Sequence, residues 1–268
     1  MKRKNISLSI VSGKGGVGKT NITLNLAYIL HSLANQVIVI DCDLGLANLD
    51  ILLGVTPKKN LKDLLSEDIK PEEIILSLDK TGLDFIPAAS GVLDLLEYES
   101  DIQFLLAKKL DTILSKYDFI LLDLGAGISN GILSFALSTS LRIVIITPEP
   151  TSLTDSYALI KILKNHYNQS NFFILVNMVE NQQEAKKSFE RLNVACQKFL
   201  GIELMYLGYV REDKNLSEAV RQQKPLFKLY PTSKACLDLI NIAKKLINFT
   251  EKTTLVKKGL NLIDNFKK

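Results

Sequence analysis

The stretch Ser12-Gly13-Lys14-Gly15-Gly16-Val17-Gly18-Lys19-Thr20 decides the fold of this chain of 268 residues. An apolar run, residues 6–11, precedes it, and a helical pattern over residues 21–30 follows it. A strand, a glycine-rich turn and a helix start, in this order, form the context that a phosphate-binding loop requires. Glycines adopt backbone conformations that other residues resist, and they leave N–H groups free to meet phosphate charge. The sequence therefore predicts a nucleotide-binding loop; the alternative is a glycine-rich turn with a chance Lys-Thr pair.

Two side chains of this loop have expected roles toward phosphate and metal. Lys19 is expected to reach the β- and γ-phosphates, and the Thr20 hydroxyl to complete a Mg²⁺ shell. The helix that begins near Lys19 adds its dipole and its unpaired N–H groups. The nucleotide-binding residues expected in this stretch are Gly13, Lys14, Gly15, Gly16, Val17, Gly18, Lys19, Thr20 and Asn21.

A second lysine, Lys14, lies inside the glycine run. A lone phosphate-binding loop does not need it, because Lys19 covers the phosphates and two neighbouring cations repel each other. Lysine at this position resembles the signature of the deviant Walker A group, the MinD/ParA family of dimerising ATPases. The resemblance implies ATP or ADP with Mg²⁺ as ligands, slow hydrolysis of ATP to ADP and phosphate, and an ATP-dependent homodimer. It also implies that Lys14 acts catalytically in trans, on the phosphates of the other subunit.

Two carboxylates, Asp41 and Asp43, end a continuously apolar run that is typical of a buried parallel strand. Doubly wound sheets place ligand chemistry at the carboxyl ends of their strands. The alternative is a pair of acids that only cap the next turn. The pair resembles the second acidic motif of the family, which implies that Asp43 orients and polarises the attacking water. Asp41 would then support the Mg²⁺ shell.

Residues 119–122 are apolar and end in Asp123, which predicts a Walker B strand whose carboxylate holds Mg²⁺ through water. The metal-binding residues expected are therefore Thr20, Asp41 and Asp123. Residues 125–127, Gly-Ala-Gly, would let the backbone approach the γ-phosphate as a switch region. The family often has a proline near this position, and this chain departs from that pattern.

The base of the nucleotide has two expected sets of contacts. Asn177, at the tip of an apolar run over residues 172–177, resembles the residue that hydrogen-bonds adenine, and its amide suits a base with donors and acceptors. The alternative is an asparagine in a turn. Val210, Arg211 and Glu212 follow the last strand, where relatives have a loop that covers the base. Relatives usually carry proline at position 211, so the match there is incomplete.

Several stretches resemble one branch of the family, the flagellar-number regulator FlhG, also called FleN. Residues 44–50 fit this branch better than MinD, which usually has arginine where Ala47 stands. Residues 149–161 nearly match its consensus and open a helix for which Thr151 or Ser152 is the expected N-cap. In relatives this segment packs at the dimer interface. The resemblance covers about residues 5–248.

The C-terminal residues 251–268 differ from the rest in combining an apolar side with several lysines. A basic amphipathic helix of this kind lies on an anionic membrane surface or docks on a partner. The alternative is a last helix that packs on its own domain. We therefore expect a MinD-like P-loop ATPase domain over residues 1–250 and a membrane-targeting helix over residues 251–268.

Composition narrows the class further. The chain is 47% hydrophobic and 23% charged, as expected for one globular domain. The net charge is +4 and the basic pairs are scattered, so specific DNA binding is not predicted. Three cysteines without a C-x-x-C motif indicate buried thiols in a reducing compartment. The sequence shows neither a signal peptide nor a long apolar run, which predicts a cytoplasmic protein that is reversibly peripheral on the inner face of the bacterial membrane.

The expected fold is a doubly wound α/β domain of the P-loop NTPase type, with a mostly parallel sheet flanked by helices. Its resemblance to FlhG implies a dimerisation switch that controls flagellar number or placement. The implied partners are an FlhF-type GTPase, flagellar switch proteins or a flagellar transcription activator. The first strand starts close to residue 1, which leaves no room for the activator helix of many FlhG proteins and favours the shorter, regulator-binding type or a second homologue.

Other functions remain as alternatives. A MinD-type division-site regulator is the nearest, and a ParA-type DNA-partition ATPase would need a basic surface. An iron–sulfur carrier would need paired cysteines, and none has the required spacing. A small-molecule ligase or kinase would need a substrate pocket that the sequence does not reveal.

Overall fold

The computed structural model describes residues 5–43, 49–66, 68–79, 82–88, 100–252 and 259–260. Eight strands form one sheet in the order β3-β4-β2-β5-β1-β6-β7-β8, and all neighbours are parallel except β3 and β4. This confirms the doubly wound fold. The strands are β1 (Ile6–Ser12), β2 (Val37–Cys42), β3 (Leu76–Asp79), β4 (Leu83–Ile86), β5 (Phe119–Ala126), β6 (Leu141–Ile146), β7 (Phe172–Val179) and β8 (Met205–Arg211).

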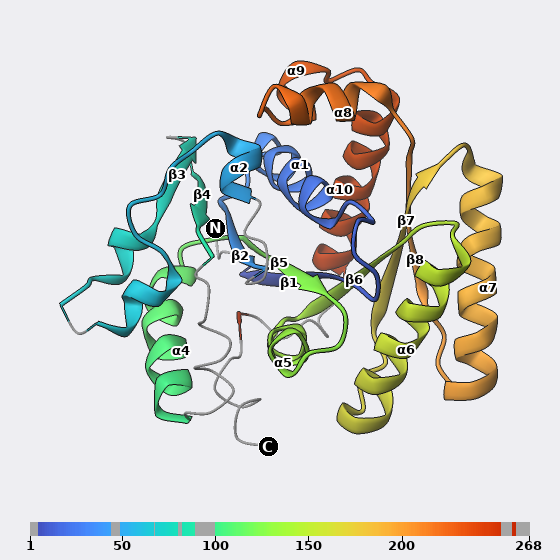
Figure 1. The fold of residues 1–268 in the computed structure, drawn as a ribbon, viewed down its shortest axis with the longest axis horizontal. Coiled ribbons are helices and arrows are strands. Elements are labelled where there is room, and N and C mark those ends of the chain that lie inside the picture. Colours follow the sequence, from blue (N-terminus) through green and yellow to red (C-terminus); the bar gives the residue numbers. More distant parts are fainter. Residues whose placement is uncertain are drawn as a thin grey trace.

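Helices cover both faces of the sheet (Figure 1). One apolar core lies under α1 and α10, and the other lies under α4, α5, α6 and α7. Short 3₁₀ turns, η1 (Leu61–Leu65) and η2 (Pro71–Ile74), precede β3. The helices are α1 (Lys19–Ser32), α2 (Leu49–Leu53), α4 (Ser100–Leu114), α5 (Asn130–Ser138), α6 (Pro150–Tyr167), α7 (Gln182–Leu200), α8 (Lys214–Arg221), α9 (Leu226–Leu229) and α10 (Lys234–Lys252).

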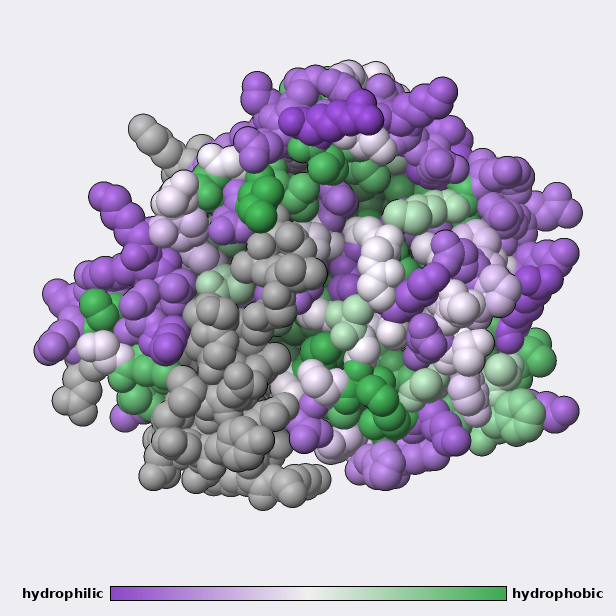
Figure 2. Space-filling model, viewed as in Figure 1, coloured by the Kyte–Doolittle hydropathy of each residue, from purple (hydrophilic) through white to green (hydrophobic). Residues whose placement is uncertain are grey.

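The central strands are buried along their whole length, because their runs of Val, Ile and Leu are covered on both sides. The three cysteines are free and buried, as expected. The surface over α8 and α9, at the top of Figure 2, is mainly hydrophilic. Within the described part of the chain, no helix combines the length and apolar character that crossing a bilayer requires.

The short edge strand β3 begins at Leu76, which pairs antiparallel with Phe85. One local prediction is wrong. The N-cap of α6 is Glu149 rather than Thr151 or Ser152, because Pro150, with its preset φ and no N–H, takes the first helical position. The Ser152 hydroxyl accepts a hydrogen bond from the backbone N–H of Thr147 at 3.0 Å, which fastens the helix to the end of β6.

The C-terminal segment returns to the start of β1. α10 runs without a break to Lys252, past the boundary expected at residue 250, and most of the expected amphipathic helix lies outside the described residues. Gly259 is described: its N–H donates to the carbonyl of Asn5 at 2.8 Å, and its carbonyl accepts from the Ser7 hydroxyl at 2.7 Å. Gly259 therefore lies at the amino-terminal end of β1.

Candidate functional site

The loop between β1 and α1 has the backbone of a phosphate cradle. Gly16 and Gly18 adopt φ values of 76° and 87°, in the left-handed region that favours glycine. Gly13 lies against α6, and a Cβ there would come within 2.1 Å of the carbonyl carbon of Asp155. These positions require glycine for different reasons, two for backbone conformation and one for close approach.

Lys19 is buried at the floor of this cradle. Its ammonium donates to the Ser12 hydroxyl at 2.9 Å. Burial lowers the pKa of Lys19, and the nearby carboxylates of Asp123 and Asp43 oppose that shift. A buried ammonium so close to exposed loop N–H groups creates a site for a polyphosphate anion.

A hollow of about 600 Å³ opens in front of the loop. It brings the loop together with Asp43, as predicted, and with side chains that the sequence did not indicate. The lining residues are Gly15, Gly16, Gly18, Lys19, Thr20, Asn21, Asp43, Ile51, Leu52, Ala126 and Met178.

Asp41 and Asp123 lie side by side, in register on the neighbouring strands β2 and β5. Burial and the charge of Asp123 raise the pKa of Asp41 to about 8. Burial raises the pKa of Asp123 to about 6, although hydrogen bonds from the Thr20 and Thr23 hydroxyls oppose the shift. Two buried carboxylates beside a threonine hydroxyl favour a hard divalent cation, since oxygen ligands suit Mg²⁺ and its charge would offset their repulsion. The donor set therefore fits the predicted metal.

Lys14 does not point at the loop that carries it. Its ammonium forms an ion pair with the carboxylate of Glu149, and it also donates to the Thr151 hydroxyl at 2.9 Å. The pair lies at the surface, where the Lys14 side chain is 35% exposed. Lys14 is thus held at the start of α6, outside the set of side chains that line the hollow.

The predicted base contacts do not gather in the hollow. The Asn177 amide is buried and donates to the carbonyl of Val17 at 2.8 Å, so it supports the loop from behind. Arg211 makes a bidentate pair with Asp238 of α10, with nitrogen–oxygen distances of 2.8 and 2.9 Å. Val210 is buried, and the backbone N–H of Glu212 donates to the Val179 carbonyl at 2.9 Å. The side chain that does reach the hollow is Met178, whose one sequence signal is its place directly after Asn177.

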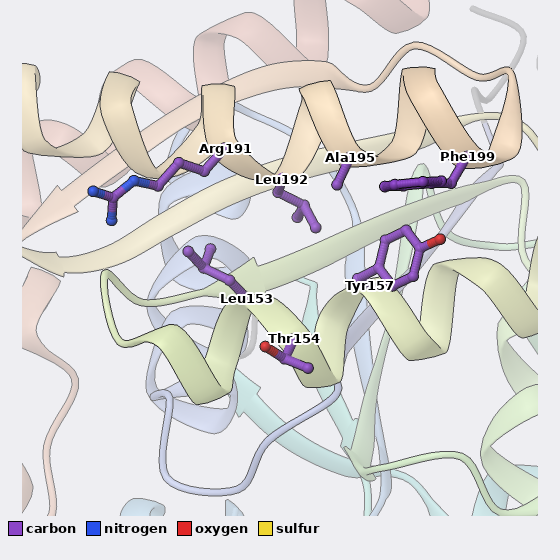
Figure 3. A pocket seen from close by; sticks show the side chains of 7 residues that line it. All are labelled: Leu153, Thr154, Tyr157, Arg191, Leu192, Ala195 and Phe199. Atoms are coloured by element: carbon purple, nitrogen blue, oxygen red, sulfur yellow. The ribbon is translucent and has the colours of Figure 1, made fainter.

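A second hollow, a groove of about 420 Å³, lies between α6 and α7. In Figure 3, Tyr157 of α6 and Phe199 of α7 face each other at one end, and the Arg191 side chain lies at the other. Phe199 is 65% exposed. The Lys198 ammonium lies 5.3 Å from the centre of the Phe199 ring, so both ends of this apolar groove carry positive charge.

The fold and the site define the class of the protein. The model of the CobQ/CobB/MinD/ParA nucleotide-binding domain matches residues 8–226. The chain belongs to this family, and it is an ATPase of the MinD/ParA type.

The chain is similar over most of its length to individual proteins of this family. The chain is 35% identical to the antiactivator FleN of Pseudomonas aeruginosa over 238 residues, which cover 89% of this chain and 85% of FleN. It is 38% identical to the flagellum site-determining protein YlxH of Helicobacter pylori over 251 residues, 91% of this chain and 82% of YlxH. The structure of the septum site-determining protein MinD of Pyrococcus horikoshii with Mg-ADP superposes with a TM-score of 0.73 at 28% identity, over 92% of this chain and 99% of MinD.

Proposed function

We propose that this protein is an ATP-dependent dimerisation switch that regulates flagellar number or placement. The observation that carries the proposal is Lys14, which is spare for its own nucleotide site and exposed beside it. Support for the flagellar role comes from the similarity to YlxH, which is named a flagellum site-determining protein, and to the antiactivator FleN. ATP, ADP and Mg²⁺ are the proposed ligands.

The proposed chemistry follows from the placement of the side chains. The loop N–H groups and Lys19 bind the phosphates. Thr20, Asp41 and Asp123 would hold Mg²⁺, which supplies positive charge to offset the phosphate oxygens. Asp43 lies in the same hollow, where its carboxylate orients and polarises the attacking water. Lys14 leaves Glu149 and reaches the phosphates of the other subunit, so that each site is complete only in the dimer.

The proposed protein partner docks in the groove between α6 and α7. An apolar floor with a cationic group at each end suits an amphipathic helix that carries carboxylates about two turns apart, because Arg191 and Phe199 are about two turns apart on α7. An FlhF-type GTPase, a flagellar switch protein or a flagellar transcription activator would present that helix. Phe199→Asp should abolish copurification with such a partner, and Lys186→Glu, on the outer side of α7, should retain it. If Phe199→Asp still copurifies with the partner, the groove is not the docking site.

Residues 251–268 are the proposed contact with an anionic membrane, and binding there would release the hydrogen bonds that join Gly259 to Asn5 and Ser7. Two tails on one dimer would bind more strongly than one, because the second contact forms at high effective concentration. ATP would therefore recruit the protein to the inner face of the membrane and hydrolysis would release it. A variant that lacks residues 253–268 should remain in solution when the ATP-bound protein is sedimented with anionic vesicles.

The central experiment measures the mass in solution with ADP, with ATP, and with ATP for Asp43→Ala. We expect a monomer with ADP and an accumulated dimer for Asp43→Ala with ATP, because the dimer no longer hydrolyses its nucleotide. A monomeric Asp43→Ala beside a dimeric wild type would reject the role of Asp43. Retention of the ATP-bound protein on DNA, falling steeply with salt, would favour the ParA-type alternative.

A further inference from the structure

Met178 occupies an irregular position at the end of β7. Asn177 pairs with Val210 and Val179 pairs with Arg211, so β7 has one residue more than β8 between these pairs. Met178 is that extra residue, and its φ is 57°. A left-handed conformation is unusual for a long side chain, and bulges of this kind often redirect a side chain beside a functional site.

The bulge changes the face of the sheet on which Met178 lies. Ile174 and Val176 face the core under α6 and α7, whereas Phe173 and Leu175 face the core under α1. Regular alternation would place residue 178 with the first group. Instead Val179 belongs to that core, and Met178 lines the hollow in front of the phosphate-binding loop, where it is 44% exposed.

Met178 lies beside the first turn of α1. Its terminal methyl carbon would be 3.6 Å from a Cβ built on Gly18, the N-cap of that helix. The same hollow holds a second exposed hydrophobic residue, Ile51 of α2, which comes shortly after Asp43 in the chain. Asp43 lies beside Gly125 of β5, since a Cβ built there would be 3.3 Å from its carboxylate, whereas Met178 belongs to β7. These two strands lie on opposite sides of β1 in the sheet, so the base belongs at the end of the hollow opposite Asp43, where we place the reacting γ-phosphate.

We propose that the Met178 side chain contacts the purine base of the bound nucleotide. The bulge turns its thioether away from the core and into the hollow. The inference rests on the proposed nucleotide site. A polarisable thioether makes a favourable contact with an aromatic ring, and the contact does not depend on the ring's hydrogen-bonding groups. Asn177, whose amide holds the Val17 carbonyl, positions the loop next to it.

The test compares Mg-ADP with inorganic pyrophosphate, which has the phosphates and lacks the base. By titration calorimetry, Met178→Ala should raise the Kd for ADP about 3- to 10-fold and leave the Kd for pyrophosphate unchanged. Leu237→Ala, at a similarly exposed hydrophobic residue of α10 outside the hollow, is the matched control and should change neither. Met178→Leu keeps an apolar side chain of similar size but lacks the sulfur, so its Kd for ADP should lie between those of wild type and Met178→Ala.

Met178→Gly separates a base contact from a structural role. Glycine relieves the left-handed backbone, so the melting temperature of the free protein should rise while affinity for ADP falls as in Met178→Ala. An unchanged ADP affinity in both variants would overturn the proposal. An equal loss of ADP and pyrophosphate would also overturn it, because the effect would then act through the loop. Different results would reject the nucleotide site itself. These are that the wild type binds neither ADP nor pyrophosphate, or that Lys19→Ala binds both with normal affinity.

Discussion

The ammonium of Lys14 and the carboxylate of Glu149 form an ion pair between the phosphate-binding loop and the start of α6. The two residues are 135 positions apart in the chain, and Thr151 shares the ammonium at 2.9 Å. In the monomer this contact holds the one lysine that the proposed dimer needs elsewhere. Dimerisation therefore requires that the pair break.

Glu149→Gln should favour the ATP-bound dimer. Both side chains are partly exposed, so each pair contributes about 0.2–1 kcal/mol. Two such pairs break in each dimer, which corresponds to at most about a 30-fold gain in the dimerisation constant. Sedimentation velocity over a dilution series with ATP measures this gain. Glu190→Gln, an exposed position on α7, is the control and should leave the constant unchanged. A weaker dimer for Glu149→Gln would show that Glu149 helps the dimer directly.

Lys14→Ala should abolish the ATP-bound dimer and leave nucleotide binding by the monomer. The reason is that Lys14 does not line its own hollow, whereas Lys19 does. Affinity for ADP should therefore stay within about twofold of wild type for Lys14→Ala and fall by more than about tenfold for Lys19→Ala, which removes a charge-assisted phosphate contact. Calorimetry and light scattering check the two parts. Dimers formed by Lys14→Ala would exclude the action in trans.

Arg211→Ala should lower stability without affecting nucleotide affinity. Asp238 is buried, and the substitution leaves its carboxylate without the bidentate partner. The expected cost is about 1–3 kcal/mol in the free energy of unfolding, measured by urea denaturation. Arg211→Ala/Asp238→Ala should recover part of this loss, since the unpaired charge is gone. A loss of ADP affinity at unchanged stability would instead support the base contact expected at Arg211.

The stability of the nucleotide-free protein should depend on pH through Asp41. Burial and Asp123 raise the pKa of Asp41 to about 8 in the folded state, so the folded protein keeps a proton that the unfolded chain releases near pH 4. The contribution of Asp41 to the free energy of unfolding therefore falls as the pH rises from about 4 to about 8. Asp41→Asn removes the effect and should raise the melting temperature at pH 8 by at least about 2 °C. Asp111→Asn, at an exposed position on α4, should leave the melting temperature unchanged. An equal rise in both variants would exclude Asp41 as the source of the pH dependence.

Local patterns predicted the central part of the site because its residues are close together or follow a simple rule. The glycine run and the helix after it are contiguous, and the carboxyl ends of parallel strands must share an edge. That rule predicts that Asp41 and Asp123 lie together, and β2 and β5 pair in the register that confirms it.

The remaining features depend on contacts that no local pattern encodes. Glu149 meets Lys14, and Asp238 meets Arg211, only after distant elements have packed. The bulge at Met178 is one of two register shifts between β7 and β8, and the run of apolar residues in β7 looks the same with or without it. The edge strand β3 is four residues long and half polar, so its pattern is too short to indicate a strand.

Gly259 is fastened to Asn5 and Ser7, at the end of β1 away from the phosphate-binding loop. The length of β1, roughly 20 Å, thus separates Gly259 from the phosphate-binding loop. Two subunits that meet through their phosphate-binding loops would carry Gly259 on their outer flanks. A probe attached near Gly259 would then report where the molecule goes in a cell without standing between the subunits.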